Sequence, residues 1–134
     1  MSPQTFKITM NKLDVIKNGD SPGKSELYYT LMVDDQIIDA LDENQARKTG
    51  DGDTIILGRS SLVTKSASAS LTVLGTVSDN DGFLKGADDT DSFREVYTAA
   101  NNFGVGPHMA RLRSGNGHLD VIVHYSRQSA PPYM

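Results

Sequence analysis

The stretch from Ala69 to Asp91, ASLTVLGTVSDNDGFLKGADDTD, joins the two features on which the fold prediction rests, an alternating strand and an acidic loop. From Ala69 to Val77 the odd positions are Ala, Leu, Val, Gly and Val, and three of the four even positions carry a hydroxyl group. Alternation with a period of two is typical of a β-strand buried on one face. The sequence therefore predicts a strand over residues 69–78 that leads directly into an aspartate-rich loop.

The loop over residues 79–91 concentrates negative charge. Five aspartates and one lysine give this segment a formal charge of −4, equal to that of the whole chain. Carboxylates at this density repel one another, and a folded chain tolerates the repulsion where water solvates them or a cation lies between them. Asp79 and Asp81 continue the alternation of the strand, so both carboxylates are expected to leave the sheet on one side, as two ligands of one ion would. An ordinary solvated turn is the alternative, because Asp, Asn and Gly are also favoured turn residues.

Shorter alternating runs, separated by turn residues, occupy the rest of the chain. The first alternates Phe6, Ile8 and Met10 with polar residues, and its break at 11–12 indicates a bulge or kink. The patch ENQARK after Asp42 is the only helix-like one, and it is too short for more than a turn or two. Besides 69–78, we expect strands over residues 4–16, 26–33, 36–41, 54–57 (with an extension or an edge at 60–66), 93–99, 109–113 and 118–126.

The last two of these strands form the clearest hairpin, around the turn SGNG at 114–117. Odd positions from Leu119 to Tyr125 are expected to face the core, and His118, Asp120 and His124 to lie on a solvated outer face. His108 is expected in a loop, without a partner.

About eight short strands, with breaker-rich turns and no convincing helix, predict an all-β fold, an antiparallel eight-stranded β-sandwich. We expect a single domain over residues 1–127 and a C-terminal tail over 128–134, which contains two prolines.

Composition excludes several classes of function. The chain has no Cys, which rules out disulfides, thiolate catalysis and thiolate zinc sites. A pI near 5.2 without a Lys/Arg cluster argues against a nucleic-acid partner. Fourteen of the seventeen acidic residues are Asp, which gathers in loops. No apolar run could span a bilayer and no signal peptide is recognisable, so we expect a soluble protein, cytoplasmic or exported by another route. No nucleophile–base motif is present, which indicates a non-enzymatic protein.

Two loops of the chain resemble the calcium loops of C2 domains. Asp20 is followed six residues later by Glu26 within the sequence SELY, where the first calcium loop of that family has a second Asp inside S-D-P-Y. The third calcium loop of the family pairs D-x-D with a further Asp about six residues on, and here 79–81 is followed by Asp88 and Asp89. Both loops occur in the family's order with strands between them. The resemblance covers residues 13–93.

The sequence departs from the family's pattern in four places. Glu26 stands where Asp is usual, Leu27 replaces Pro, the spacing from Asp81 to Asp88 is one residue longer, and the D-D-x-I-G ending of the third loop is absent. The chain is therefore similar to a divergent C2-like sandwich, and another calcium-dependent β-sandwich such as a jelly-roll lectin stays open.

The resemblance implies Ca²⁺ as the bound ion. Ca²⁺ takes six to eight oxygen ligands in flexible geometry, whereas Mg²⁺ demands a tighter octahedron. Three scattered histidines give zinc little support, and the EF-hand spacing fails, because Leu84 stands where Gly is needed and Thr90 where Glu is needed. Asp51 and Asp53 could join the site from a middle loop, although a turn explains them as well. If the two acidic loops meet at one end of the sandwich, the expected ligands are Asp20, Glu26, Asp79, Asp81 and Asp88 or Asp89.

Phe83, Leu84 and Lys85 lie between the two acidic clusters of the second loop. Two apolar side chains and a cation beside a bound ion would suit insertion among lipid headgroups, with the ion bridging to phosphate. The alternative is that Phe83 and Leu84 fold back and anchor the loop.

Three functions follow from this pattern. The first is a peripheral membrane protein that binds Ca²⁺ and through it an anionic ligand, with phospholipid as the expected one. The second is a structural or assembly subunit that contacts protein partners or further copies of itself. The third is a lectin in which the ion coordinates sugar hydroxyls.

Overall fold

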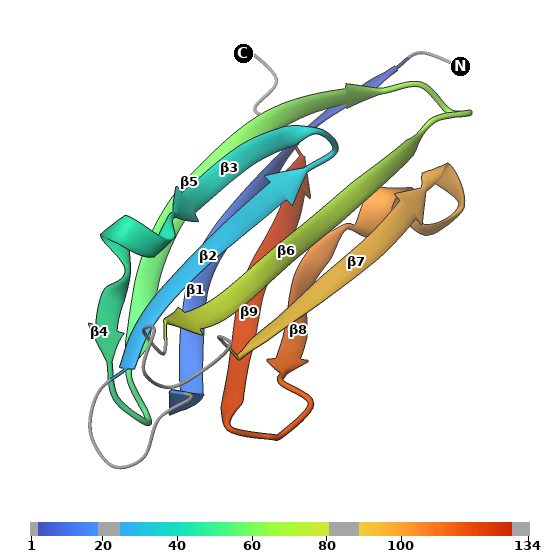
Figure 1. Ribbon diagram of the computed structural model, residues 1–134. Helices are drawn as coiled ribbons and strands as arrows, with labels where there is room; N and C mark the ends of the chain where they lie inside the picture. Colours follow the sequence, from blue (N-terminus) through green and yellow to red (C-terminus); the bar gives the residue numbers. More distant parts are fainter. Residues whose placement is uncertain (1–2, 19–24, 81–88, 130–134) are drawn as a thin grey trace.

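A computed structural model describes residues 3–18, 25–80 and 89–129. Figure 1 shows these residues forming two antiparallel sheets packed face to face. The expected all-β sandwich is confirmed, although the described residues contain nine strands instead of eight. The strands are β1 (Gln4–Asn18), β2 (Ser25–Val33), β3 (Gln36–Leu41), β4 (Arg47–Thr49), β5 (Thr54–Lys65), β6 (Ser70–Asn80), β7 (Thr90–Thr98), β8 (Gly106–Arg113) and β9 (Leu119–Ser129), with two 3-10 turns, η1 (Glu43–Gln45) and η2 (Ala99–Gly104).

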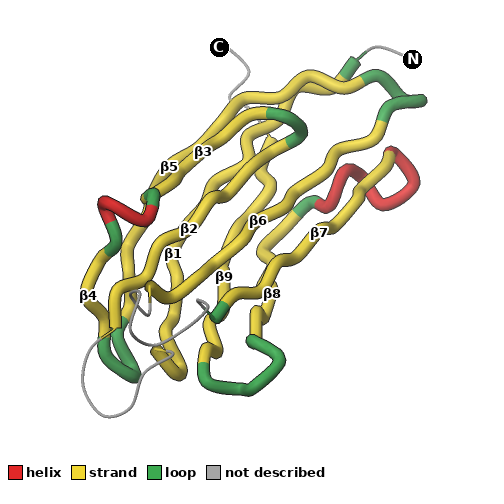
Figure 2. The backbone as a smooth tube through the Cα atoms, in the orientation of Figure 1, coloured by secondary structure: helices red, strands yellow, loops and turns green. Residues whose placement is uncertain are grey.

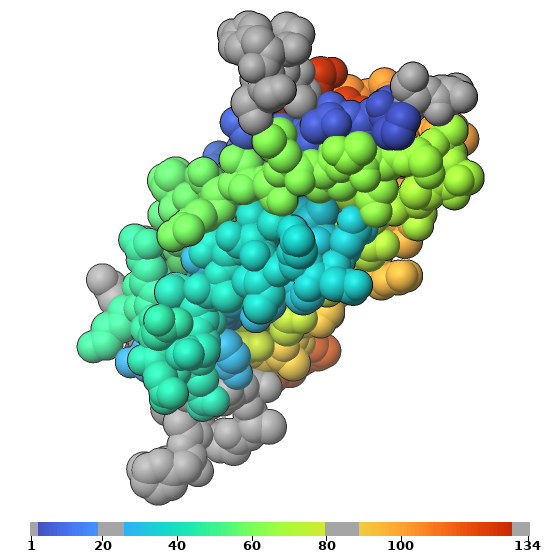
Figure 3. Space-filling model, turned by 90° about the horizontal axis from the view of Figure 1, so that it is seen from above, coloured from blue at the N-terminus to red at the C-terminus, as the bar shows by residue number. Residues whose placement is uncertain are grey.

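The first sheet has the strand order β5-β1-β9-β8, and the second has the order β3-β2-β6-β7, with β4 paired to β2. Figure 2 shows how little of the described chain is helical, since only the two short 3-10 turns interrupt the strands and loops. The edge strands β3 and β5 contact each other, and Figure 3 shows them side by side. One edge of the sandwich is therefore covered by residues from both sheets.

The core follows the alternation read from the sequence. Phe6, Ile8 and Met10 of β1 are buried, and so are the odd positions of β6 from Leu71 to Val77 and of β9 from Leu119 to Tyr125. The pairing of β1 with both of its neighbours shifts between Met10 and Lys12, which confirms the expected bulge. The bulge brings Leu13 and Val15 back to the core side.

Residues 42–65 follow the prediction except for one strand that was not expected. The helix-like patch forms only η1, where the side chain of Asp42 accepts a hydrogen bond from the backbone N of Gln45 at 3.0 Å. The following residues form β4, because Arg47–Thr49 pair with the start of β2. Of the two alternatives for residues 60–66, an extension of the strand at 54–57 or an edge, the structure shows the extension, because both segments lie in the single strand β5. At the other end of the chain β9 continues to Ser129, two residues past the expected domain boundary.

Candidate functional site

One end of the sandwich, which we call the acid pole, gathers the ends of most strands. There β1 and β6 end, β2 and β7 begin, and the turns at 50–53 and 114–118 connect their strands, as the lower part of Figure 1 shows. The opposite end, where β1 begins and β9 ends, we call the aromatic pole.

The pairing of β2 with β6 brings the described flanks of the two acidic loops together. Glu26 pairs with Asn80 and Leu27 with Asp79, in antiparallel register. Adjacent strands lie about 4.8 Å apart. The first acidic loop therefore rejoins the sheet beside the point where the second leaves it.

Asp79 lies on the core side of β6. Its exposed fraction is 0%, and its backbone N donates a hydrogen bond to the carbonyl of Asp89 at 2.9 Å. The strand thus persists to Asn80, and Asp79 continues the inward alternation after Val77. A buried carboxylate costs several kcal/mol unless donors or a cation compensate its charge. Because Asp79 is buried, the free energy of its charged form depends strongly on the groups around it.

Asp89 and Asp91 are tied to the β8–β9 turn. The side-chain amide of Asn116 donates to one carboxylate oxygen of Asp89 at 2.6 Å, and the other oxygen lies 4.0 Å from Nδ1 of His118. The backbone N of Arg113 donates to Asp91 at 2.8 Å. These contacts fix the far end of the second acidic loop against the first sheet.

The turn at 50–53 belongs to the same pole. The backbone N of Asn18 donates to the carboxylate of Asp51 at 3.0 Å, and the backbone N of Gly50 donates to that of Asp53 at 2.7 Å. Both carboxylates therefore accept hydrogen bonds from backbone groups, as the turn explanation for these residues requires.

The other predicted site residues divide into two groups. Glu26 is half-buried at the start of β2. Among the residues that the structure describes, no three His, Asp or Glu side chains lie close enough to hold a metal ion. The predicted ligands Asp20, Asp81 and Asp88 and the predicted contact residues Phe83, Leu84 and Lys85 lie outside the described residues.

Two charged clusters on the first sheet were not anticipated. Asp120 is 1% exposed, because Arg111 of β8 donates two hydrogen bonds to its carboxylate, at 2.9 and 2.6 Å. The solvated environment expected for Asp120 was wrong. The hydrogen bonds from Arg111 lower the pKa of this carboxyl group. In the hairpin register Arg113 pairs with Asp120, and Arg111 lies two residues away on the same face of β8. The predicted hairpin therefore already indicated that an arginine could reach Asp120.

The second cluster joins Asp14 to His124. His124 Nε2 donates to one oxygen of Asp14 at 2.7 Å, and the hydroxyl of Thr54 donates to the other at 2.8 Å. The Thr54 hydrogen bond is the largest contribution that lowers the pKa of Asp14. These residues come from three strands far apart in the sequence, so no local pattern could reveal them.

At the aromatic pole, ring stacking closes the sandwich. Phe103 is fully buried and stacks on Phe6 with 5.3 Å between ring centroids, and the Arg127 guanidinium lies 4.4 Å from the centroid of the Phe6 ring. Burial lowers the pKa of Arg127. His108, expected in a loop without a partner, lies on β8, stacks against Tyr125 and donates from Nε2 to the carbonyl of Gly104.

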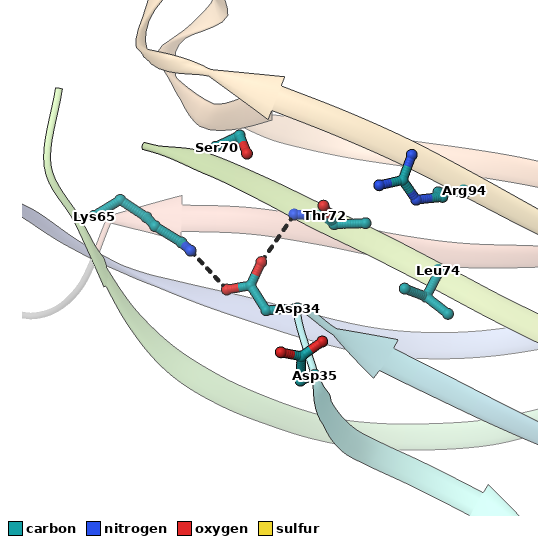
Figure 4. Close-up of a pocket in the computed structure, with 7 residues that line it drawn as sticks. All are labelled: Asp34, Asp35, Lys65, Ser70, Thr72, Leu74 and Arg94. Carbon is teal, nitrogen blue, oxygen red and sulfur yellow. Dashed lines mark hydrogen bonds and ion pairs between the residues drawn. The ribbon is translucent and has the colours of Figure 1, made fainter. Parts of the chain in front are cut away.

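An open depression of about 550 Å³ lies beside the turn between β2 and β3 (Figure 4). Asp34, with a φ of 52°, accepts hydrogen bonds there from the backbone N of Thr72 at 3.0 Å and pairs with Lys65 at 2.8 Å. The charges of Asp34 and Lys65 thus compensate each other. The depression lies at the opposite end of β2 and β6 from the acidic loops.

Comparison with known proteins identifies the architecture. No protein-family model matches the sequence, and no curated protein matches it. A C2 domain structure is similar over 93% of this chain and 98% of its own, at 13% identity and a TM-score of 0.54. A C2 domain protein from Ramazzottius varieornatus covers 99% of this chain and 92% of its own, at 12% identity and a TM-score of 0.51. Human GIVD cytosolic phospholipase A2 matches 96% of this chain with 17% of its own, at 10% identity and a TM-score of 0.50.

Because these identities are low, the similarity concerns the fold alone. A separate point is that none of the helices in the described ranges has the length and apolar character needed to cross a membrane. The two sheets, their strand order and the near-complete coverage by C2 domain structures agree with one another. The chain has a C2-like fold.

Proposed function

We propose that this chain is a non-enzymatic calcium-binding domain that recruits an anionic ligand, phospholipid first of all, at its acid pole. One observation carries the proposal: Leu27 pairs with Asp79, so the described flanks of the two acidic loops lie on neighbouring strands. Carboxylates from two adjacent loops can supply the several oxygen ligands that Ca²⁺ requires.

Burial of Asp79 and the net charge of the second loop add support. A segment with a charge of −4 gains most from a divalent ion placed near its base, where the solvent screens charges least. We assign Asp79 and Glu26 to the base of the site, with Asp20, Asp81 and Asp88 or Asp89 as further ligands. Asp89 already accepts a hydrogen bond from Asn116, which favours Asp88 for the last position.

An ion held by surface loops leaves coordination positions for an outside oxygen. A lipid phosphate supplies such an oxygen, and Phe83 and Leu84 would add apolar contact beside it. The structurally similar human protein is by name a phospholipase, an enzyme that acts on lipid. Phospholipid is therefore the first ligand to test.

A calcium titration with thermal unfolding as the readout tests the ion site. Because a ligand that binds only the folded state stabilises it, the melting temperature should rise with Ca²⁺ concentration. Substituting Asp79→Asn together with Asp81→Asn should abolish the rise. Asp35→Asn with Asp42→Asn removes the same charge from two exposed positions away from the acid pole and should leave the rise intact. An unchanged rise in the first variant would falsify the assignment of these ligands.

Co-sedimentation with phospholipid vesicles tests the ligand. The fraction of protein bound should increase when Ca²⁺ replaces a chelator, and the increase should shrink in a Phe83→Ser, Leu84→Ser variant. Calcium-dependent binding to a glycan array without any response to vesicles would assign the site to a lectin. Self-association that ignores calcium would favour the assembly function instead.

A further inference from the structure

Two asparagines of the chain are followed by glycine, Asn18 by Gly19 and Asn116 by Gly117. A glycine in that position has no side chain to shield its backbone nitrogen, so the nitrogen can approach the side-chain amide carbon of the asparagine. Asparagine loses its amide group in water most readily in such pairs, which makes it a labile residue. The structure places the two asparagines in opposite surroundings.

The fold protects the amide of Asn18. This residue ends β1 and is 1% exposed. Its side-chain amide donates to the carbonyl of Thr49 at 3.0 Å, and its backbone N donates to the carboxylate of Asp51 at 3.0 Å. The side chain can turn toward the nitrogen that follows it only when the end of β1 separates from its neighbours.

Asn116 lies in the exposed turn between β8 and β9. Its Oδ1 accepts hydrogen bonds from the hydroxyl of Ser114 at 2.6 Å and from the backbone N of His118 at 2.9 Å. Two donors on one amide oxygen draw electrons from the carbon Cγ, and they stabilise the negative charge that the oxygen gains when a nucleophile attacks Cγ. The turn therefore activates this amide for attack.

Gly117 supplies the nucleophile. Its φ of +75° lies in the left-handed region, which glycine adopts without strain. Its backbone N donates to the carbonyl of Ser114 at 2.8 Å, and this hydrogen bond must open before the nitrogen can attack. Because Gly115, Asn116 and His118 are exposed around it, water can replace that carbonyl without unfolding of the strands.

We propose that Asn116 is a site of spontaneous deamidation, which replaces its amide by a carboxylate beside Asp89. The backbone N of Gly117 gives its proton to water and bonds to Cγ of Asn116. The bond between Cγ and Nδ2 breaks, and Nδ2 takes up a proton from water and leaves as ammonia. A cyclic imide remains, and one water molecule opens it to aspartate or to isoaspartate, in which the main chain runs through the side-chain carbon. Water is the only co-reactant.

Deamidation reverses the contact between this turn and the second acidic loop. Nδ2 of Asn116 donates to Oδ1 of Asp89 at 2.6 Å, and an oxygen in place of Nδ2 has no hydrogen to donate. Two carboxylates in contact repel each other unless a proton or a cation lies between them. The reaction therefore adds one negative charge to the acid pole and releases the turn from Asp89. It does not require the proposed calcium site.

Incubation of the folded full chain at mildly alkaline pH, followed by proteolysis and mass spectrometry, measures the loss of each amide. In the folded chain Asn116 should react at least about tenfold faster than Asn18, because a strand must open before Asn18 can react. In denaturant the two residues should react at similar rates. The proposal is overturned if Asn116 keeps its amide in the folded chain while the denatured chain loses it, or if the two residues react equally fast in the folded chain.

A longer amide side chain provides the matched control. Asn116→Gln keeps an amide at this position but must close a larger, less favoured ring, so ageing should leave its charge unchanged on ion exchange. The unchanged chain should gain one negative charge with time and elute with the Asn116→Asp variant. The same gain of charge in Asn116→Gln would place the reaction at another residue and refute the proposal.

The melting temperature in chelator tests the contact with Asp89. Asn116→Ala removes the hydrogen bond to Asp89, whereas Asn116→Asp removes it and adds a carboxylate that Asp89 repels. Asn116→Asp should therefore melt at a lower temperature than Asn116→Ala, and the aged chain should melt at a lower temperature than the fresh one. Equal melting temperatures for Asn116→Asp and Asn116→Ala would show that the new carboxylate does not meet Asp89, contrary to the proposal.

Discussion

The two poles of the sandwich are closed by different chemistry. At the aromatic pole, Phe103 of η2 fills the space between the sheets and stacks on Phe6. At the acid pole, the equivalent position at the end of β6 is occupied by the buried carboxylate of Asp79, and the turns around it are held by hydrogen bonds to aspartates. The aromatic pole is filled by rings, whereas the acid pole places a buried carboxylate among hydrogen-bonded aspartates. This difference is the reason that the proposed ion site is assigned to the acid pole, and it makes the aromatic pole the place to test stability.

The largest expected effect comes from emptying the aromatic pole. Phe103→Ala removes a fully buried ring and should lower the free energy of unfolding by about 3–5 kcal/mol, because a cavity remains that the strands cannot fill. Denaturant unfolding measures the loss. Val105→Ala, at a position that is exposed two residues away, should cost less than about 0.5 kcal/mol. A small loss for Phe103→Ala would mean that the pole is held by something other than its rings.

Gly104 tests how tightly the same pole is packed. It has a φ of +70°, and an added Cβ would lie 2.7 Å from the ring of Tyr97. Gly58 has nearly the same φ, +69°, with nothing within 4 Å of an added Cβ. Gly58→Ala should cost about 1–2 kcal/mol for the backbone alone, and Gly104→Ala should cost about 1–3 kcal/mol more for overpacking. Equal losses in thermal unfolding would show that Tyr97 moves aside freely.

Low pH should lower the stability that the carboxylates Asp120 and Asp14 contribute to the folded chain. The pKa values of Asp120 and Asp14 lie below their ordinary value of 3.8 in the folded chain. Both carboxylates therefore contribute stability above that value, and the contribution is lost as pH falls through their folded pKa values. Asp120→Asn should cost about 1–3 kcal/mol at neutral pH.

The same substitution should make the dependence of unfolding free energy on pH shallower below about pH 4. Denaturant unfolding at several pH values measures both effects. Asp35→Asn, at an exposed site, is the control and should change neither the stability nor its pH dependence. If Asp120→Asn does not change the dependence of the unfolding free energy on pH, the other carboxylates cause that dependence.

The smallest effect is expected in the turn that anchors the acidic loop. Asn116→Ala removes the hydrogen bond to Asp89 and should cost about 0.5–1.5 kcal/mol. If the proposed site binds Ca²⁺, the freed carboxylate adds a ligand, so any rise in melting temperature with Ca²⁺ should be at least as large in this variant as in the unchanged chain. A weaker calcium response would indicate that Asp89 must be held by Asn116 in order to act as a ligand.

The sandwich could be predicted because its strands alternate locally. The period of two over 69–78 and from Leu119 to Tyr125 places the same apolar residues inside as the structure does. The break at Asn11 predicted the bulge. These features depend on neighbours within one strand, which a sequence displays directly.

Features that depend on distant partners could not be predicted. The patch after Asp42 has helical residues, yet pairing with β2 turns its second half into β4. Asp14 meets His124 across 110 positions of the chain. At the acid pole the assignment of Asp79 and the two acidic loops to one site stays a prediction, and the contact of Asp89 with Asn116 could not be predicted, because it depends on the hairpin folding back beside β7.

The phenol groups of Tyr97 and Tyr125 are joined by a hydrogen bond at 2.7 Å, in a chain whose optical absorbance depends on tyrosine. The chain has five tyrosines and no tryptophan, so its near-ultraviolet absorbance comes chiefly from phenol rings. Burial raises the pKa values of Tyr29, Tyr97 and Tyr125 in the folded state. These three phenols should stay neutral while the fold is intact and ionise together when alkali opens it, so the phenolate band reports whether the sandwich is folded.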